Sequence, residues 1–175
     1  MCTIGVAVAI PEPWATQLQD YRKSIGDLMA ATIPTHITLV PPTEVGEDLA
    51  VVEEHLALAA SELRSFRVHL RGTGTFRPVS PVVFVTLVEG ISQCEQLADA
   101  LRRGPLGVQL DFPYHPHVTV AHHLEDGPLD RAFADLADFE CEFSVAEFHL
   151  YVHDQEHGWQ PTREFPLLPP LDPGR

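Results

Sequence analysis

The stretch His36-Ile37-Thr38-Leu39 returns about eighty residues later as His117-Val118-Thr119-Val120, and this repeat decides the fold. A proline lies just upstream of each copy, and each copy sits in an apolar run rich in β-branched residues, which favours a strand. Residues i and i+2 of a strand point to the same face, with Cα atoms roughly 6.6 Å apart. Each copy is therefore predicted to present one imidazole beside one hydroxyl.

Two imidazoles and two hydroxyls in matching positions suit acid–base chemistry at a phosphate. Histidine titrates near neutral pH, so one copy can hold a proton while the other lacks it, as a general acid and a general base require. A threonine hydroxyl can donate a hydrogen bond to a phosphate oxygen. We interpret His36 and His117 as catalytic candidates and Thr38 and Thr119 as phosphate-binding candidates. Either copy alone would fit ordinary strand residues equally well, so the hypothesis depends on the pair.

Further segments carry a family resemblance. They are the glycine-rich run Leu70-Arg71-Gly72-Thr73-Gly74-Thr75-Phe76, the strand-like run 82–87 that follows it, and the closing segment from Phe143 to Leu167. Together with the two motifs, they make the sequence resemble the 2H phosphoesterase superfamily, whose bacterial branch is the 2'-5' RNA ligase or cyclic phosphodiesterase family. The resemblance runs from about Thr3 to Leu167. It implies that a 2',3'-cyclic phosphate or a related RNA phosphoester is the substrate, that His117 is the base and that His36 is the acid.

The chain departs from this family after the second motif. Many relatives carry a basic residue there, often arginine, where this chain reads Ala121-His122-His123. A neutral imidazole is a poorer partner for an anion than a permanent guanidinium, so His122 would replace it only when protonated. We keep His122 as a possible substrate contact, together with Phe76, Arg77 and Tyr114. The aromatic side chains of Phe76, Tyr114 and Trp159 could stack a base or simply pack in the core.

Strand–helix–strand units recur around the two motif strands. Apolar spacing predicts helices over 14–29, 48–63, 92–103 and 126–137, and strands over 66–70, 82–88, 108–110, 142–152 and 159–165. The prolines at 41 and 42 are expected to end the first motif strand. This order predicts an α+β fold: two pseudo-symmetric βαβ-containing lobes with antiparallel-rich sheets around a central groove. We expect one bilobal domain over 1–167 and a proline-rich C-terminal tail over 168–175.

Composition narrows the class of partner. The formal net charge of −14 repels polyanions at long range, so a protein that coats long nucleic acids is not expected. A small nucleotide or an RNA end bearing a cyclic phosphate is the expected partner. The apolar start of the chain is too short for a membrane span, and the three cysteines are far apart, as is usual in a reducing compartment. We expect a cytoplasmic protein without membrane association and in monomeric form.

Four histidines, at 115, 117, 122 and 123, raise the question of a metal site. Their spacing matches no common zinc pattern, and no carboxylate follows until the next turn. We therefore predict neither a metal nor another cofactor. The leading hypothesis is a metal-independent phosphodiesterase that opens a 2',3'-cyclic phosphate and that could run in reverse as a 2'-5' RNA ligase. The alternative is a non-catalytic protein that binds a nucleotide or an RNA-terminal phosphate.

Overall fold

The computed structural model describes residues 1–172. Its eight strands form one sheet in the order β6-β3-β4-β5-β2-β1-β7-β8, and every neighbouring pair is antiparallel. The elements in chain order are β1 (Cys2–Ala9), α1 (Trp14–Ser24), the 3-10 helix η1 (Leu28–Ala31), β2 (His36–Val45), α2 (Ala50–Glu62), β3 (Phe66–Thr75), β4 (Val82–Glu89), α3 (Ile91–Arg102), β5 (His117–His122), α4 (Asp126–Asp135), β6 (Glu140–Val145), β7 (Glu147–Asp154) and β8 (Gly158–Pro166).

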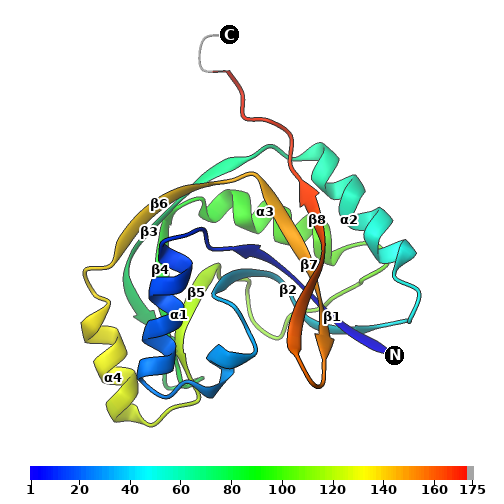
Figure 1. The fold of residues 1–175 in the computed structure, drawn as a ribbon. Coiled ribbons are helices and arrows are strands. Elements are labelled where there is room, and N and C mark those ends of the chain that lie inside the picture. The colour runs from blue at the N-terminus through cyan, green and yellow to red at the C-terminus, as the bar shows by residue number, and fades with distance from the viewer. Residues whose placement is uncertain (173–175) are drawn as a thin grey trace.

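The sheet consists of two four-stranded halves that meet at the motif strands. One half is β6-β3-β4-β5 and the other is β2-β1-β7-β8. Ile37 of β2 pairs with Val118 of β5, and this pair of residues joins the halves. Figure 1 shows the sheet curving from β6, β3 and β4 on the left, through β5 and β2, to β1, β7 and β8 on the right. The α+β class with two related lobes is thereby confirmed.

Helices cross between the halves. Helix α1 leads into β2 but packs against β5, and α3 leads into β5 but packs against β2. The buried residues of α3 show why it packs there: Cys94, Leu97, Ala98 and Leu101 recur at helical spacing and form one apolar stripe. Such packing buries the middle residues of both motifs, Ile37 and Val118, which are 0% exposed.

Two predicted strands were wrong. Residues 108–110 form no strand, although their apolar alternation indicated one. The strand predicted over 142–152 is broken at Ala146 into β6 and β7, which belong to opposite halves of the sheet. The buried residues change phase at Ala146, from Cys141, Phe143 and Val145 on β6 to Phe148 and Leu150 on β7, and the pairing partner changes there from β3 to β1.

Element ends also differ from the prediction. Helix α1 ends at Ser24 rather than near residue 29, because Gly26 adopts a positive φ of 84° that turns the chain out of the helix. Strand β2 continues through Pro41 and Pro42, where its register with β1 shifts between Ile4 and Val6. A proline has no N–H to donate, and such a bulge tolerates it. The glycine-rich run, which reads as a turn or a bulge, lies within β3 and contains a bulge around Gly72, whose φ is 75°.

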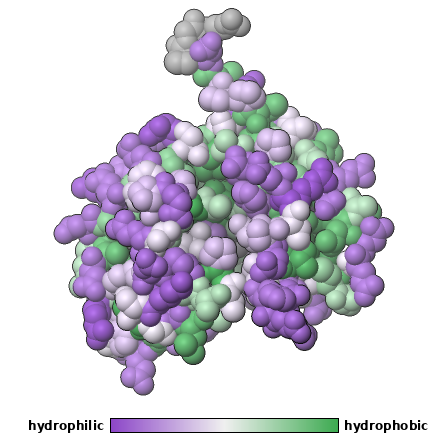
Figure 2. Space-filling view, viewed as in Figure 1, coloured by the Kyte–Doolittle hydropathy of each residue, from purple (hydrophilic) through white to green (hydrophobic). Residues whose placement is uncertain are grey.

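The C-terminal segment begins beside α2. Leu168 exchanges backbone hydrogen bonds with Leu63 and Ser65. Residues 173–175 of the expected tail lie outside the described residues. On the face drawn in Figure 2, hydrophilic residues cover most of the surface, in keeping with the acidic composition. Among residues 1–172, no helix is long and apolar enough to cross a membrane.

Candidate active site

The four motif side chains share one face of the sheet, which we call the motif face. Ile37 and Val118 are paired and fully buried, whereas His36, Thr38, His117 and Thr119 are half-buried. Because side chains alternate along a strand, the two residues on either side of a buried one point to the opposite face. The antiparallel register around the Ile37–Val118 pair then places His36 opposite Thr119 and Thr38 opposite His117. Tertiary structure therefore brings the two sequence motifs together.

Both motif imidazoles are held in the same way by the backbone. Nδ1 of His36 lies 2.7 Å from the carbonyl oxygen of Pro34, and Nδ1 of His117 lies 2.7 Å from that of His115. A carbonyl can only accept, so Nδ1 carries the hydrogen in each ring and Nε2 of the neutral ring is free to accept. In both motifs the accepting carbonyl belongs to the residue two positions before the histidine, so the two imidazoles are anchored equivalently.

The two Nε2 atoms differ in their surroundings. Nε2 of His36 lies 3.0 Å from the Thr38 hydroxyl, which donates to it when the ring is neutral. Burial lowers the pKa of His36, the hydrogen bond to Pro34 opposes this, and the charge of Arg22 adds to the lowering. Burial also lowers the pKa of His117 to about 4, with additional lowering from His115 and His36. At neutral pH both rings are therefore uncharged in the absence of an anion.

The lowered pKa of His117 predicts a loss of stability in acid. Between pH 6.5 and about 4 the unfolded chain binds a proton at this residue and the folded chain does not. The free energy of unfolding therefore falls as the pH falls through that window, by at most about 3 kcal/mol for His117. Above pH 6.5 this residue causes no such loss. In His117→Gln, urea unfolding at pH 7 and pH 4.5 should show a smaller difference than in the wild type. His153→Gln, which alters an exposed histidine, should leave the difference unchanged. Equal differences in all three proteins would contradict the assignment.

Aromatic rings crowd the His117 side of the motif face. The ring centroid of Phe76 lies 4.9 Å from that of His117 in an edge-on arrangement, and the Phe84 centroid lies 5.3 Å from it. The two phenylalanine rings are 4.5 Å apart, and both contact His115. Phe76 thus lies where the sequence placed a possible substrate contact. The rings also limit how much water reaches the imidazole.

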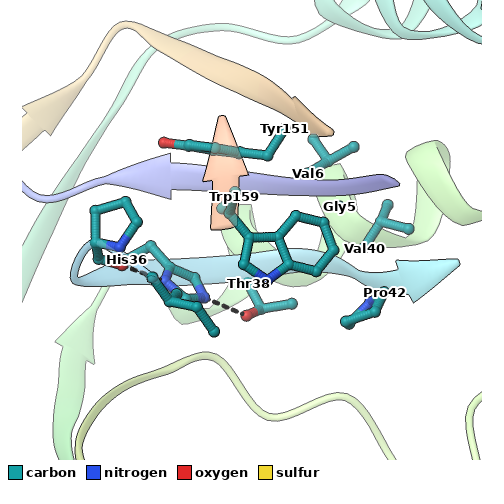
Figure 3. Close-up of a pocket in the computed structure, with 11 residues that line it drawn as sticks. Gly5, Val6, His36, Thr38, Val40, Pro42, Tyr151 and Trp159 are labelled. Atoms are coloured by element: carbon teal, nitrogen blue, oxygen red, sulfur yellow. Dashed lines mark hydrogen bonds between the residues drawn. The ribbon is translucent and has the colours of Figure 1, made fainter. Parts of the chain in front are cut away.

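The His36 side has an open pocket instead. It has a volume of about 160 Å³ and is lined by residues of β1, β2, β7 and β8, including His36, Thr38, Gly5, Tyr151 and Trp159. Figure 3 shows the indole of Trp159 lying over β1 near Gly5, with Tyr151 on one side and Thr38 on the other. We call this the Trp159 pocket. Its lining is mainly apolar, with the motif imidazole and hydroxyl at one end.

The other predicted contacts lie farther from the imidazoles or are already engaged. The guanidinium of Arg77 pairs with Asp130 at 2.8 Å and with Asp126 at 3.5 Å, both on α4. The hydroxyl of Tyr114 donates to the backbone carbonyl of Thr38 at 2.7 Å and so ties the segment before β5 to the first motif strand. The ring of His122 lies against that of His123, with centroids 3.7 Å apart.

A buried ion pair lies behind the start of β2. Nε of Arg22 is 3.0 Å from Oδ2 of Asp27, and the two side chains are 4% and 0% exposed. Arg22 also donates to the carbonyl of Ile33 at 3.3 Å, and Oδ1 of Asp27 accepts from the backbone N–H of Met29 at 3.1 Å. The charges of this pair reach His122, whose pKa is lowered first by burial, then by His123 and Arg22, against the opposing effect of Asp27. The pair therefore fixes the entry to the first motif and contributes to the field at the motif face.

The model of the 2'-5' RNA ligase superfamily matches residues 10–157, which is most of the chain. The protein belongs to this superfamily.

Relatives of this superfamily member agree with the assignment. A Bacillus licheniformis protein that carries a provisional phosphoesterase name is 31% identical over 158 residues, covering 86% of this chain and 92% of the relative. A similarly named protein of Bacillus cytotoxicus is 29% identical over 140 residues, covering 78% and 81%. Apo LigT of E. coli has the same fold, with a TM-score of 0.67 at 22% identity and coverage of 95% and 98%. TT0787 of Thermus thermophilus gives a TM-score of 0.66 at 23% identity, with the same coverage. Membership supports a phosphoesterase or ligase activity in general.

Some residues at the site of this 2'-5' RNA ligase superfamily member were not singled out from the sequence. They are Gly5, Arg22, Asp27 and Tyr151. A glycine inside a strand often marks the close approach of another group, and Gly5 carried that signal. Arg22, Asp27 and Tyr151 gave none, because the sequence does not show that Arg22 and Asp27 are buried as a pair or that Tyr151 lines a pocket.

Proposed function

We propose that the chain is a metal-independent phosphodiesterase that hydrolyses a 2',3'-cyclic phosphate, or a related small cyclic or terminal RNA phosphoester, by paired-histidine general acid–base catalysis. The pairing of Ile37 with Val118 carries the proposal, because it sets two imidazoles and two hydroxyls on one face of adjacent strands. Membership of the 2'-5' RNA ligase superfamily supports the same chemistry.

In the proposed reaction His117 is the base. With Nδ1 bound to a carbonyl and the pKa lowered to about 4, its Nε2 is an available lone pair at neutral pH. It takes a proton from water as the water oxygen bonds to phosphorus. Phe76 and Phe84 crowd the imidazole on that side, which favours a small nucleophile such as water. A base whose pKa lies below the working pH is already in its active form.

His36 is the acid in this scheme. The anionic phosphate of the substrate raises the pKa of His36, because an opposite charge favours the protonated ring. As the bond between phosphorus and one ribose oxygen breaks, Nε2 of His36 gives its proton to that oxygen. The products are a phosphate monoester and a free hydroxyl, and the two imidazoles then exchange protons with solvent. If the 5'-hydroxyl of a second RNA end takes the place of water, His117 accepts its proton, its oxygen bonds to phosphorus, and the 3'-oxygen leaves with the proton of His36. The product is then a 2'-5' phosphodiester that joins the two ends.

The motif threonines bind the non-bridging phosphate oxygens in this scheme. When the substrate arrives, the Thr38 hydroxyl leaves Nε2 of His36 and donates to phosphate. Thr119 does the same from the other strand. Donors that are already in place where charge grows in the transition state stabilise it more than mobile water does.

Small nucleotides suit the site. The LigT fold has been crystallised with 3'-AMP and with NADP+, in structures that give TM-scores of 0.58 and 0.59 against this chain. Those ligands belong to LigT. For this chain they support the choice of nucleotides as test substrates, and the net charge of −14 disfavours long polyanions.

The test is a panel of 2',3'-cyclic mononucleotides and short RNAs that end in a cyclic phosphate. The wild type should open at least one of them to a monoester, with a bell-shaped dependence on pH and no change in rate in EDTA. Activity that EDTA abolishes and zinc restores would overturn the mechanism. Binding of a nucleoside monophosphate without turnover of any panel member would instead favour the non-catalytic nucleotide-binding alternative.

A further inference from the structure

The two halves of the motif face differ most in size at the position paired with the motif threonine. On β1, the residue paired with Thr38 is Ala7, and on β4 the residue paired with Thr119 is Phe84. The neighbouring pairs match as well, since Val8 faces Ile37 and Val85 faces Val118. A methyl group on one half therefore corresponds to a phenyl ring on the other. One half is hollow where the other is filled.

The filled half has no room for a substrate ring. A Cβ atom on Gly74 would lie 2.7 Å from the ring of Phe84, so the absence of a side chain at Gly74 allows that ring to lie against β3. Phe76 then packs against Phe84, with ring centroids 4.5 Å apart. Both rings contact His117. The organic part of a substrate must therefore extend from the other side of the phosphate.

The hollow half is the Trp159 pocket. Gly5 and Ala7 are the small residues on its floor, and a Cβ on Gly5 would already lie 3.4 Å from the indole. The backbone N–H of Trp159 donates to the carbonyl of Thr32 at 3.1 Å, which fixes the position of the backbone at Trp159. Gly158 supports this contact with a φ of 74° and packs so closely that a Cβ would lie 2.7 Å from the same carbonyl. The backbone that carries the indole is therefore anchored before any ligand arrives.

Size and chemistry indicate what the pocket takes. An apolar cavity of roughly 150 Å³ holds one benzene ring, and the Trp159 pocket has about 160 Å³. An indole face stacks well on a planar ring. Burial raises the pKa of Tyr151, so its hydroxyl remains a neutral hydrogen-bond donor to a polar ring edge.

We propose that the Trp159 pocket binds the base of the substrate nucleoside and prefers the single ring of a pyrimidine to a purine. The inference rests on the proposed function, which sets the orientation of the substrate. The nucleoside lies on the His36 side, next to the ribose oxygen that His36 protonates, and water enters on the His117 side. Trp159 and Gly5 determine specificity, and they take no part in proton transfer.

Binding without turnover is the first measurement. The chain has two tryptophans, so Trp14→Phe leaves Trp159 as the one indole reporter. Cytidine 3'-monophosphate should quench its fluorescence and bind more tightly than adenosine 3'-monophosphate. In the otherwise wild-type chain, Trp159→Ala should weaken the binding of cytidine 3'-monophosphate, measured by calorimetry, about 5- to 150-fold. This is the range for the loss of one base–aromatic stack. Gly5→Val, which fills the floor, should weaken it as well. Phe133→Ala, an exposed aromatic on α4, is the control and should bind as the wild type does. Thermal melting establishes that each variant is folded.

Turnover separates this inference from the proposed function. Trp159→Ala should raise KM for cytidine 2',3'-cyclic phosphate and leave kcat/KM for ribose 2',3'-cyclic phosphate, which has no base, near the wild-type value. Binding that depends on Trp159 without any turnover would support the pocket and refute the proposed function. Turnover that is indifferent to Trp159→Ala and Gly5→Val would refute the pocket and leave the proposed function standing. Equal or tighter binding of the purine nucleotide would overturn the pyrimidine preference.

Discussion

Replacing His36 or His117 with asparagine is expected to lower the turnover of a 2',3'-cyclic phosphate by roughly 10²- to 10⁴-fold. Asparagine is the sharpest substitution, because its amide N–H can still donate to the carbonyl of Pro34 or His115, as Nδ1 does now. The group that titrates is lost, whereas the anchoring hydrogen bond is retained. The measurement is single-turnover hydrolysis over a range of pH.

The pH profile distinguishes the two roles. If His117 is the base, His117→Asn should flatten the acidic limb of the bell, and His36→Asn should flatten the alkaline limb. The double variant should lose little more than either single variant, since groups that act as a unit are not additive. His157→Asn removes an exposed imidazole from the turn between β7 and β8 and should leave the rate unchanged. A loss below tenfold in either motif variant would refute paired-histidine catalysis.

Asp27→Asn should destabilise the fold by about 3–5 kcal/mol, the usual cost of leaving a buried charge without its partner. The amide oxygen can still accept from the N–H of Met29, so the loss is specific to the carboxylate. The guanidinium of Arg22 would remain 4% exposed with only the carbonyl of Ile33 as partner. Since Ile33 leads into the first motif, activity should also fall before global unfolding. Urea unfolding measures the first effect and the rate at low urea the second.

An exposed ion pair provides the comparison. Arg67 and Glu142 lie 3.1 Å apart on β3 and β6, with about half of each side chain exposed. Glu142→Gln should cost less than about 1 kcal/mol, because solvent already screens the pair. If Asp27→Asn and Glu142→Gln changed the free energy of unfolding equally, the Arg22–Asp27 pair would have no special structural role.

Local sequence was enough for several parts of the fold and the site. The alternation in the two motifs predicted that each imidazole shares a face with a hydroxyl, and the intervening Ile37 and Val118 are fully buried, in agreement with that alternation. Apolar residues at helical spacing located α3 and α4 to within about two residues. These features succeed because the spacing of residues within one element depends on its own backbone geometry. The class of fold followed from the order of such elements.

The tertiary structure decided which elements contact each other. The alternation of residues 140–154 changes phase at Ala146, but which half of the sheet each piece joins depends on its pairing partner, β3 for β6 and β1 for β7. The same holds for Trp159 over Gly5 and for Arg22 beside Asp27, whose meeting depends on how α1, η1 and β8 pack. The sequence by itself determined that two imidazole–hydroxyl pairs exist and which way each faces. The antiparallel pairing of Ile37 with Val118, which sets them side by side, is a product of long-range packing between the two halves.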